Sequence, residues 1–472
     1  MDGLECSEIY LKTLERTLRI DAEFYKKGNL YFSAFLQKKV LQPFTKSFSI
    51  SDGNHMSISE SFCMEGIPYY RGQDIYSVFI EESSPVCIDR DTFLHPHMIR
   101  SHLKQNDVLM SIVGAIVGNS AIVSSNIEAT CSCKLAIMRS KNEDISPQVL
   151  LAFIKTKYGQ NQIQKFKRGA AQTGLLLEDF DQLFIPQFSR NFQQQIRDII
   201  QSAHGAMTDG SKSYNEAQNF LLNQLHFDFD VMSTEGTSEK RLSESFGVSG
   251  RLDAEYYQPK YDQLFAALTA FETSTLGGSG GIADFQKSIE PGSESYGEEG
   301  IPFVRVSDIT KFGISAPEIK LPVDIVEHPE TLFPKKDSIL FSKDGSVGIA
   351  YKLEKDAQFI TSSALLQLTI RDTEKVLPDY LTLVLNSPVV QLQAERAASG
   401  AVIQHWKPSE IQQVIIPILD MTEQKELSKM VQESFSLRRQ SEQLLDYAKQ
   451  AVELAIEQGE DIAMVWLKDK VK

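Results

Sequence analysis

The 472-residue sequence has no run of 18 or more uncharged apolar residues, the length that a helix needs to cross a bilayer. Its longest apolar stretches, such as 108–117, are interrupted by Ser and Gly. The first residues are acidic and lack an apolar signal core. The five cysteines are an odd number and all lie in the first 133 residues, a pattern that does not form a disulfide framework. These absences predict a protein of a reducing compartment, and we expect it in the cytoplasm.

Positive charge is also scarce. The chain has 48 Lys and Arg against 63 Asp and Glu, which gives a net charge of -15. This balance excludes a surface that coats nucleic acid indiscriminately, so any DNA contact must come from local basic patches. With 42 % hydrophobic and 24 % charged residues, the composition is that of a globular protein long enough for several domains with apolar cores.

Catalytic motifs are missing as well. The sequence lacks a Walker lysine loop, a Gly-x-Ser-x-Gly elbow, a His-Glu-x-x-His helix and the Asn-Pro-Pro-Tyr/Phe signature of amino-methyltransferases. Cys131 and Cys133 lie near three histidines but lack the two-residue spacer usual for zinc ligands, so we expect no metal site. No residue qualifies as catalytic. Missing motifs alone do not exclude a nuclease, whose carboxylates are sparse.

What the sequence does contain is a repeat. Residues 251–257 (Arg-Leu-Asp-Ala-Glu-Tyr-Tyr) match residues 19–25 (Arg-Ile-Asp-Ala-Glu-Phe-Tyr) at a shift of 251 - 19 = 232. Three further matches follow at shifts of about 230 to 234: 66–75 with 300–309, 107–111 with 337–342, and 185–186 with 416–417. Collinear matches at a nearly constant shift indicate an internal duplication.

Each copy is expected to be an α/β (α+β) domain. A helical apolar pattern follows each opening phrase, and short runs of β-branched and aromatic residues follow at 67–70, 108–112, 120–123 and 135–139, and again at 302–306, 338–341, 348–353 and 365–370. Proline-first helices begin at 147 and 378. The sheets are expected to be mixed or mainly antiparallel.

Two polar stretches interrupt this pattern. Residues 191–227 and 421–458 are rich in Gln and Glu and carry a thin apolar seam, which predicts two long helices that form a coiled coil. Together with the duplication, the two seams indicate pseudo-twofold symmetry. The domains are then 1–190, 228–420 and a C-terminal extension at 459–472. Gly205 to Gly210 could break the first long helix. The expected seam residues are Ile196, Ile199, Ala203, Leu221, Leu427, Val431, Leu445 and Val452.

This organisation resembles the DNA-specificity subunit of Type I restriction-modification systems. The most specific residues are 251–257, 341–348 (Phe-Ser-Lys-Asp-Gly-Ser-Val-Gly) and 415–417 with the Gln-rich helix that follows. The resemblance implies two target-recognition domains, each reading one half of a bipartite double-stranded DNA site, and long helices paired as an antiparallel coiled coil. It implies a subunit that is not an enzyme and binds no cofactor itself. It also implies partners: two methyltransferase subunits, which carry S-adenosylmethionine, and in some complexes a restriction or translocase subunit. The alternative function is a phage-defence interaction scaffold of the same architecture that binds no DNA.

Candidate DNA contacts follow from the need for basic and amide side chains at phosphates and base edges. In the first copy the basic residues have no acid among them, although a solvated helix face is the alternative; the candidates are Lys155, Lys157, Lys165, Lys167, Arg168, Gln172 and Thr173. In the second copy a glycine-rich turn and a later loop contribute candidates, although the glycines could serve only a hairpin; these are Lys335, Lys336, Lys343, Ser346, Gln404, His405 and Lys407.

The repeated opening phrase is expected to be structural. We expect Asp21 and Glu23 in the first copy, and Asp253 and Glu255 in the second, to anchor the junction between each domain and its long helix, far from the candidate DNA loops.

Overall fold

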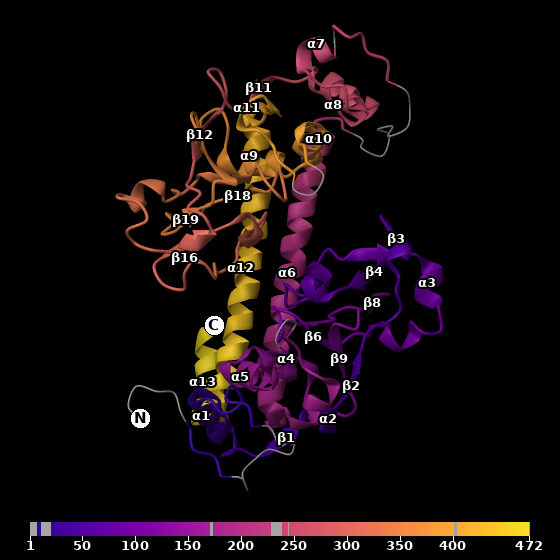
Figure 1. The fold of residues 1–472 in the computed structure, drawn as a ribbon, viewed down its shortest axis with the longest axis vertical. Helices are drawn as coiled ribbons and strands as arrows, with labels where there is room; N and C mark the ends of the chain where they lie inside the picture. Colours follow the sequence, from indigo (N-terminus) through magenta and orange to yellow (C-terminus); the bar gives the residue numbers. More distant parts are fainter. Residues whose placement is uncertain are drawn as a thin grey trace. The chain divides into compact units, whose positions relative to one another are not determined.

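The computed structural model describes residues 7–10, 20–169, 173–227, 238–243, 245–400 and 404–471. The chain divides into two compact units. Unit 1 comprises residues 1–208 and 439–472, and unit 2 comprises residues 209–438. Two long helices, α6 (Arg190–Gln224) and α12 (Met421–Gln458), each contribute one part to either unit, and Figure 1 shows α6 in magenta and α12 in yellow.

Unit 1 is a mixture of helices and short strands. Its helices besides α6 and α12 are α1 (Lys27–Leu36), α2 (Phe44–Ser47), α3 (Arg90–Leu94), α4 (Pro147–Lys155), α5 (Lys157–Phe166) and α13 (Glu460–Lys470). Its strands are β1 (Leu41–Pro43), β2 (Phe48–Asp52), β3 (Phe62–Cys63), β4 (Ile67–Tyr70), β5 (Val86–Ile88), β6 (Val108–Ser111), β7 (Ser120–Ile122), β8 (Thr130–Cys131), β9 (Leu135–Ser140) and β10 (Phe184–Pro186). One sheet has the antiparallel order β2-β9-β6-β7, and a second has the order β3-β5-β4-β8 with β4 and β8 parallel.

Unit 2 has the same kinds of element in the same order. Its helices are α7 (Phe246–Ser249), α8 (Pro259–Leu268), α9 (Pro378–Leu385), α10 (Pro388–Ala397) and α11 (Pro408–Ile411). Its strands are β11 (Thr273–Thr275), β12 (Ala283–Lys287), β13 (Ile301–Val304), β14 (Ile309–Thr310), β15 (Gly313–Ile314), β16 (Lys320–Leu321), β17 (Ile339–Ser342), β18 (Ala350–Lys352), β19 (Ile360–Thr361), β20 (Leu365–Ile370) and β21 (Ile415–Pro417). The main sheet has the antiparallel order β12-β20-β17-β18, and β13 pairs in parallel with β19.

Buried glutamine side chains make the same hydrogen bonds in both units. Gln193 accepts from the Ser146 N–H and donates to the carbonyls of Asp144 and Phe188. Gln424, at a shift of 424 - 193 = 231, accepts from the Leu377 N–H and donates to the carbonyls of Lys375 and Leu419. Each glutamine thus satisfies three backbone groups that would otherwise be buried without partners.

A second pair of glutamines repeats this agreement at the short end strands. Gln162 donates to the carbonyl and accepts from the N–H of Phe184 in β10. Gln393 does the same with Ile415 in β21. Both contacts therefore recur at a shift of 231. The first joins α5 to β10, and the second joins α10 to β21; each of these strands precedes a long helix.

The first long helix is continuous through the glycines that could have broken it, since α6 includes both Gly205 and Gly210. Within unit 2, a Cβ added at Gly210 would lie 3.0 Å from the carbonyl oxygen of Ser434 on α12. The Ser434 hydroxyl donates to the Gly210 carbonyl at 2.6 Å. Gly210 therefore permits a close approach of α6 and α12 rather than a break.

The expected seam residues lie in or against the hydrophobic cores of their own units. Seven are at most 6 % exposed, and Leu445 is partly buried. Ile196, Ile199, Ala203 and Val452 belong to the main core of unit 1, against which Leu445 packs, and Leu221, Leu427 and Val431 to that of unit 2. After Gly459, with φ +104°, the chain continues as α13, whose Trp466 packs edge-on against Tyr447. None of the described helices combines the length and hydropathy that crossing a membrane requires.

In the second copy of the repeated phrase, the expected residue Asp253 takes part in the anchor, Glu255 does not, and Arg251 was not expected. Arg251 pairs with Asp253 and donates to the Ala397 carbonyl at 3.0 Å, while Glu255 is exposed. In the first copy, Asp21 accepts from the Phe24 N–H, Glu23 pairs with Lys26 on the surface, and Arg19 lies outside the described residues. The cause is that the guanidinium, not the glutamate, reaches the end of α10.

The expected distance between this phrase and the candidate DNA loops is also wrong. Arg251 and Tyr256 line the same cavity as Trp406 and Glu410, which flank the candidate residue Lys407. The phrase and the loop approach because α10, which Arg251 and Tyr256 contact, leads directly into that loop.

Candidate nucleic-acid interface

In unit 2 the glycine-rich turn and the later loop meet, forming what we name the second crossing (residues 343–348, 399–400 and 404–406). The Gly345 N–H donates to the Gln404 carbonyl at 2.9 Å, and the Trp406 N–H donates to the Lys343 carbonyl at 2.8 Å. Asp344 and Ser399 both form β-bridges with His405. Gly345 has φ +74°, a conformation that glycine adopts without strain. The backbone therefore fixes the two segments side by side.

The side chains of the second crossing form a compact polar cluster. Asp344 pairs with the Lys343 ammonium and accepts from His405 Nδ1 at 2.9 Å when that nitrogen carries the proton. Gln404, His405 and Ser346 are exposed, and Lys343 is half-buried. The cluster presents donors and acceptors of the kinds that contact base edges and phosphates. Asp344 was not expected from the sequence, although its position next to Lys343 in the turn could have indicated the pairing.

Unit 1 has a first crossing built in the same way (residues 112–118, 168–169 and 173–175). The Gly114 N–H donates to the Thr173 carbonyl at 2.8 Å, and the Leu175 N–H donates to the Ile112 carbonyl at 2.9 Å. Val113 and Arg168 both form β-bridges with Gly174. These contacts match those of the second crossing at a shift of 231, for example Gly114 with Gly345.

The two crossings differ in their side chains. Where the second crossing has Lys343, Asp344, Gln404 and His405, the first has Ile112, Val113, Thr173 and Gly174. At these four positions one crossing carries charged and amide side chains, and the other carries apolar side chains and a hydroxyl. Arg168 of the first crossing is paired with Asp179. The same backbone arrangement thus displays two different surfaces.

The basic residues predicted for the first copy are largely committed to internal contacts. Lys165 is only 7 % exposed and its ammonium lies 4.1 Å from the Phe24 ring centroid. Arg168 pairs with the buried carboxylate of Asp179. Lys157 pairs with Glu457 at 2.6 Å. These partners, which the sequence pattern did not reveal, occupy Lys165 and Arg168, while Lys157 stays exposed beside Glu457.

Two further members of that set differ in environment. Lys155 is half-buried at the end of α4, and burial together with the nearby charge of Lys449 lowers its pKa to about 8. Lys167 is half-buried directly after α5, close to the first crossing in sequence. Gln172 lies outside the described residues, and Thr173 contributes its carbonyl to the first crossing. Of the first-copy candidates, Thr173 and Arg168 are part of the crossing and Lys167 adjoins it.

The structure also divides the candidates of the second copy. Lys335 and Lys336 are exposed, but they precede β17, while the turn of the second crossing follows it. The four residues of β17 separate the two sets by roughly 13 Å. Lys407 directly follows the crossing, and its ammonium nitrogen lies 3.5 Å from a carboxylate oxygen of Glu410. The structure thus brings together Lys343, Ser346, Gln404, His405 and Lys407, and leaves Lys335 and Lys336 apart.

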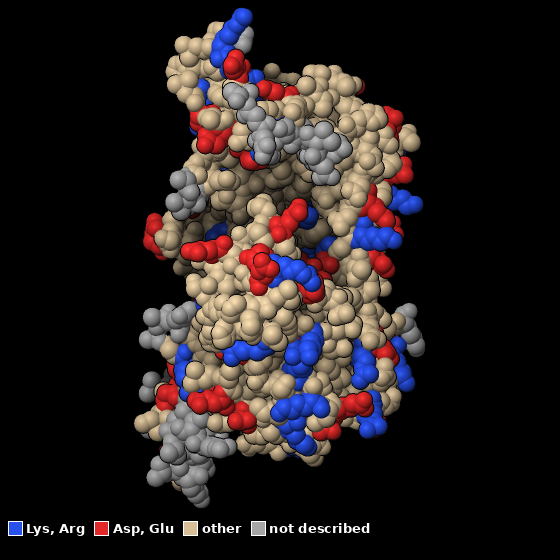
Figure 2. All heavy atoms as spheres, turned by 90° about the vertical axis from the view of Figure 1, so that its right-hand side faces the viewer, with Lys and Arg blue, Asp and Glu red and all other residues tan. Residues whose placement is uncertain are grey.

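Charges of both signs are interspersed on the surface. Figure 2 shows Lys and Arg mixed with Asp and Glu on the face it presents, with basic side chains more frequent in the lower half of the view. The face in Figure 2 therefore carries no continuous coat of basic side chains, as expected from the net charge of -15. Among the residues that the structure describes, no group of three or more His, Cys, Asp and Glu side chains is arranged to hold a metal ion.

Comparison with known proteins gives similar solved structures only. No family model matches the chain, and no curated protein does. The S subunit of a Type I restriction-modification system from M. genitalium is 14 % identical, with a TM-score of 0.35, over 91 % of this chain and 95 % of that one. The HsdS subunit from Thermoanaerobacter tengcongensis is 15 % identical, with a TM-score of 0.30, over 89 % and 97 %.

A chain from a structure of type I restriction-modification complex assembly is also similar, with 16 % identity and a TM-score of 0.29 over 89 % of this chain and 98 % of that one. These three solved structures are two S subunits and one assembly of Type I restriction-modification systems, and a type IIG restriction endonuclease is similar over 39 % of this chain, with 10 % identity and a TM-score of 0.31. These TM-scores are all below 0.5, so a functional proposal for this chain has to rest on its own residues.

Proposed function

We propose that this chain is the non-catalytic specificity subunit of a DNA-modifying complex, and that it reads a bipartite DNA site. The observation that carries the proposal is the pair of crossings. One backbone arrangement recurs at a shift of 231 and displays Lys343, Gln404 and His405 in one unit but Ile112 and Thr173 in the other. Two target-recognition domains that arose by duplication and now read different half-sites would have this property.

The chemistry of each crossing suits a different half-site. The second crossing offers an ammonium, an amide and an imidazole, which can contact phosphate oxygens and the donors and acceptors of base edges. At the equivalent positions the first crossing offers a hydroxyl and apolar side chains, which favour contact with thymine methyl groups, while its Arg168 is paired with Asp179. Each half-site would therefore be read through its own side chains on a shared frame.

The remaining parts of the proposal concern partners. The two long helices would form the antiparallel coiled coil that sets the spacing between half-sites. Methyltransferase subunits, two per chain, would dock on this subunit and carry S-adenosylmethionine, and a restriction or translocase subunit would join complexes that cleave DNA. The complex would act on DNA in the cytoplasm.

Salt-dependent DNA binding tests the proposal against a scaffold without a DNA role. The chain assembled with the methyltransferase encoded beside it should bind duplex DNA with an affinity that falls steeply with salt, because bound lysines release counterions from phosphates. The complex carrying Lys343→Ala should show a smaller slope, and Lys336→Ala, whose lysine lies away from the crossing, should not. Binding without a salt slope, or no binding, would contradict the proposal.

A further inference from the structure

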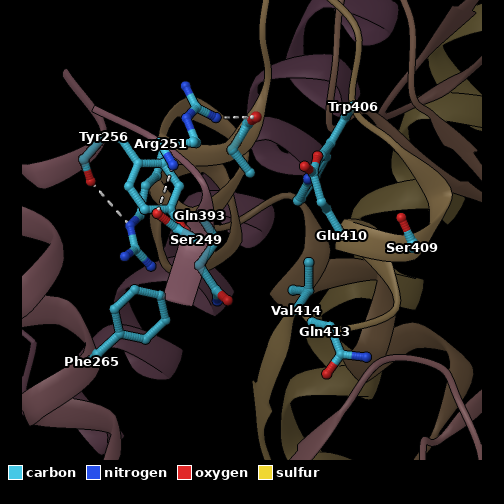
Figure 3. Close-up of a pocket in the computed structure, with 12 residues that line it drawn as sticks. Ser249, Arg251, Tyr256, Phe265, Gln393, Trp406, Ser409, Glu410, Gln413 and Val414 are labelled. Atoms are coloured by element: carbon cyan, nitrogen blue, oxygen red, sulfur yellow. Dashed lines mark hydrogen bonds between the residues drawn. The ribbon is translucent and has the colours of Figure 1, made fainter. Parts of the chain in front are cut away.

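One cavity of unit 2 combines a cation, a buried hydrogen-bond donor and apolar walls. It has a volume of about 310 Å³ and lies between α8, α10 and α11. Figure 3 shows two groups of lining residues that face each other, with Arg251, Tyr256 and Phe265 on one side and Trp406, Glu410 and Gln413 on the other. The proposed function assigns no role to this cavity.

Arg396 provides the cation. Its guanidinium carbon lies 4.1 Å from the ring centroid of Tyr256 and 4.9 Å from that of Phe265. Its Nε donates to the Tyr256 carbonyl at 3.2 Å, its Nη groups donate to no described residue, and no acid among the described residues pairs with it. Stacking on aromatic rings fixes the plane of a guanidinium and leaves its remaining N–H groups for another partner. A guanidinium held in this way is oriented to bind a planar anion.

The indole Nε1 of Trp406 is the second donor. Trp406 is 1 % exposed, and its Nε1 donates to no atom of the described residues. The position of the ring is fixed, because the Trp406 backbone N–H donates to the Lys343 carbonyl and the ring packs against Phe341 with 5.8 Å between centroids. A buried donor without an acceptor destabilises a fold, so an acceptor in the cavity would be bound favourably.

The charges around the cavity favour a ligand with a single negative charge. Arg251 pairs with Asp253, and Glu410, which also lines the cavity, contacts Lys407. Among the described residues of the lining, this leaves Arg396 as the cation without an acidic partner. A doubly charged phosphate would place uncompensated charge near the Glu410 carboxylate. A carboxylate carries one charge and accepts from a guanidinium and an indole together.

Apolar side chains determine what carries the carboxylate. Phe265, Ala397 and Val414 line the cavity. Its volume of about 310 Å³ is at the lower end of ligand pockets, which span roughly 300 to 1,000 Å³ and pair apolar walls with a few polar groups. The cavity therefore suits a small ligand that has an apolar body and one acidic group.

We propose that this cavity binds a small monocarboxylate with an aromatic or branched aliphatic body. The carboxylate accepts from Arg396 and from the Trp406 indole. The body contacts Phe265 and Val414. A free carboxylic acid and the last residue of a peptide both present this chemistry.

The proposed site belongs to unit 2 alone. At the repeat shift, 406 - 175 = 231, Trp406 corresponds to Leu175, whose side chain has no donor. The cavity beside α5 in unit 1 is lined by Asp181, whose carboxylate would repel another one. Each chain should therefore bind one ligand.

Tryptophan fluorescence of the full-length chain tests the proposal. The sequence contains two tryptophans, so Trp466→Phe leaves Trp406 as the reporter. Phenylacetate and N-acetylleucine should each change the Trp406 emission, with a Kd of about 1 mM or tighter for ligands of this size. Phenylacetamide, which lacks the charge, should not. Tighter binding of N-acetylleucine would identify a peptide terminus as the source of the ligand, and tighter binding of phenylacetate a free acid.

Two variants in the Trp466→Phe background test the position of the ligand. Arg396→Gln removes the guanidinium, and Gln413→Glu adds a negative charge to a side chain that makes no hydrogen bond to a described residue. Each should weaken phenylacetate binding at least about tenfold. Lys336→Gln and Gln358→Glu make the same changes of charge at exposed positions of unit 2 and should bind as the parent does. Thermal melting checks that Gln413→Glu folds as the parent does, so the test does not depend on Arg396→Gln.

Several results would overturn the proposal. One is the absence of both a Trp406 response and saturation transfer to either carboxylate in NMR. Others are equal binding of phenylacetamide, tighter binding of inorganic phosphate, and unchanged binding by Gln413→Glu. Displacement of phenylacetate by duplex DNA would also overturn it, because the cavity would then contact a DNA phosphate. The proposed function is tested separately by salt-dependent DNA binding, so either can fail without the other.

Discussion

The buried glutamines and the two crossings are both repeated at a shift of 231, but they have diverged to different degrees. Gln193 and Gln424 have the same three hydrogen bonds, and so each constrains its unit in one way. The crossings keep their backbone bonds while Lys343 and His405 replace Ile112 and Gly174. The difference indicates which parts of each unit are held for stability and which are free to acquire a new specificity.

The largest expected effect is the loss of stability when the repeated glutamines are replaced. Gln193→Ala and Gln424→Ala should each lower the free energy of unfolding by about 3 kcal/mol, because three buried backbone groups lose their partner. Urea titration followed by circular dichroism measures this. Gln201→Ala, an exposed position on α6, should change stability by no more than about 0.5 kcal/mol. If the two buried sites respond very differently, the equivalence of the units in this contact is wrong.

The next effect separates the crossings from each other. His405→Ala or Gln404→Ala should weaken discrimination at one half-site by about 1 to 3 kcal/mol, roughly tenfold or more in affinity, and leave the other half-site unchanged. Thr173→Ala should act on the other half-site only. Competition binding with duplexes mutated in one half at a time measures both. Equal losses at both half-sites from a single variant would show that the crossings do not act separately.

A smaller effect is expected where the crossings agree. Gly114 and Gly345 have φ values of +96° and +74°, and neither has an atom within 4 Å of an added Cβ. Gly114→Ala and Gly345→Ala should therefore cost only backbone strain, about 1 kcal/mol each. Thermal melting would detect this as a decrease of a few degrees at most. A much larger loss at one of them would mean that its turn has contacts that the other lacks.

A pH-dependent effect concerns a residue that differs between the units, Lys155 in unit 1 and Asn386 in unit 2. Burial and Lys449 lower the Lys155 pKa from its usual 10.5 to about 8. Between these values the unfolded chain binds the additional proton, so this lysine makes stability rise as pH increases from 8 to 10.5. Lys155→Met should therefore stabilise the chain at pH 7, with the gain shrinking toward pH 10.5.

Melting temperatures of Lys155→Met measured across this range test the direction. Lys336→Met, at an exposed lysine, provides the control and should show no such trend. A gain that grows with pH would mean that the Lys155 ammonium is stabilised rather than destabilised by its surroundings.

Much of the regular structure could be predicted from the sequence. The strands at 67–70 and 365–370 and the proline-first helices at 147 and 378 begin where the patterns indicated, because β-branched runs and an N-terminal proline act locally. Short strands such as β3, β14 and β15 were missed, since two residues carry no periodicity and pair only through their neighbours. The continuity of α6 through Gly210 depends on the approach of α12, which local propensity does not reveal.

The candidate site was harder to predict for a physical reason. A run of lysines and arginines without acids indicated a basic patch, but Lys165 covers Phe24 and Arg168 pairs with Asp179, eleven residues later. Such partners are set by tertiary structure. The run is also divided among the end of α4, α5 and the segment that follows α5. The turn at 343–348 and the loop at 404–407 were both identified from their residue types. Only the structure shows that they meet.

Base-resolved mapping of modified adenines tests the central claim most directly. The chain would be co-expressed with its neighbouring methyltransferase in a host that lacks other modification enzymes. We predict one bipartite motif with a fixed gap in the wild type, and a motif altered in one half only when residues 404 and 405 are replaced by the Thr and Gly of the first crossing. A single contiguous motif, or a change in both halves, would contradict the account.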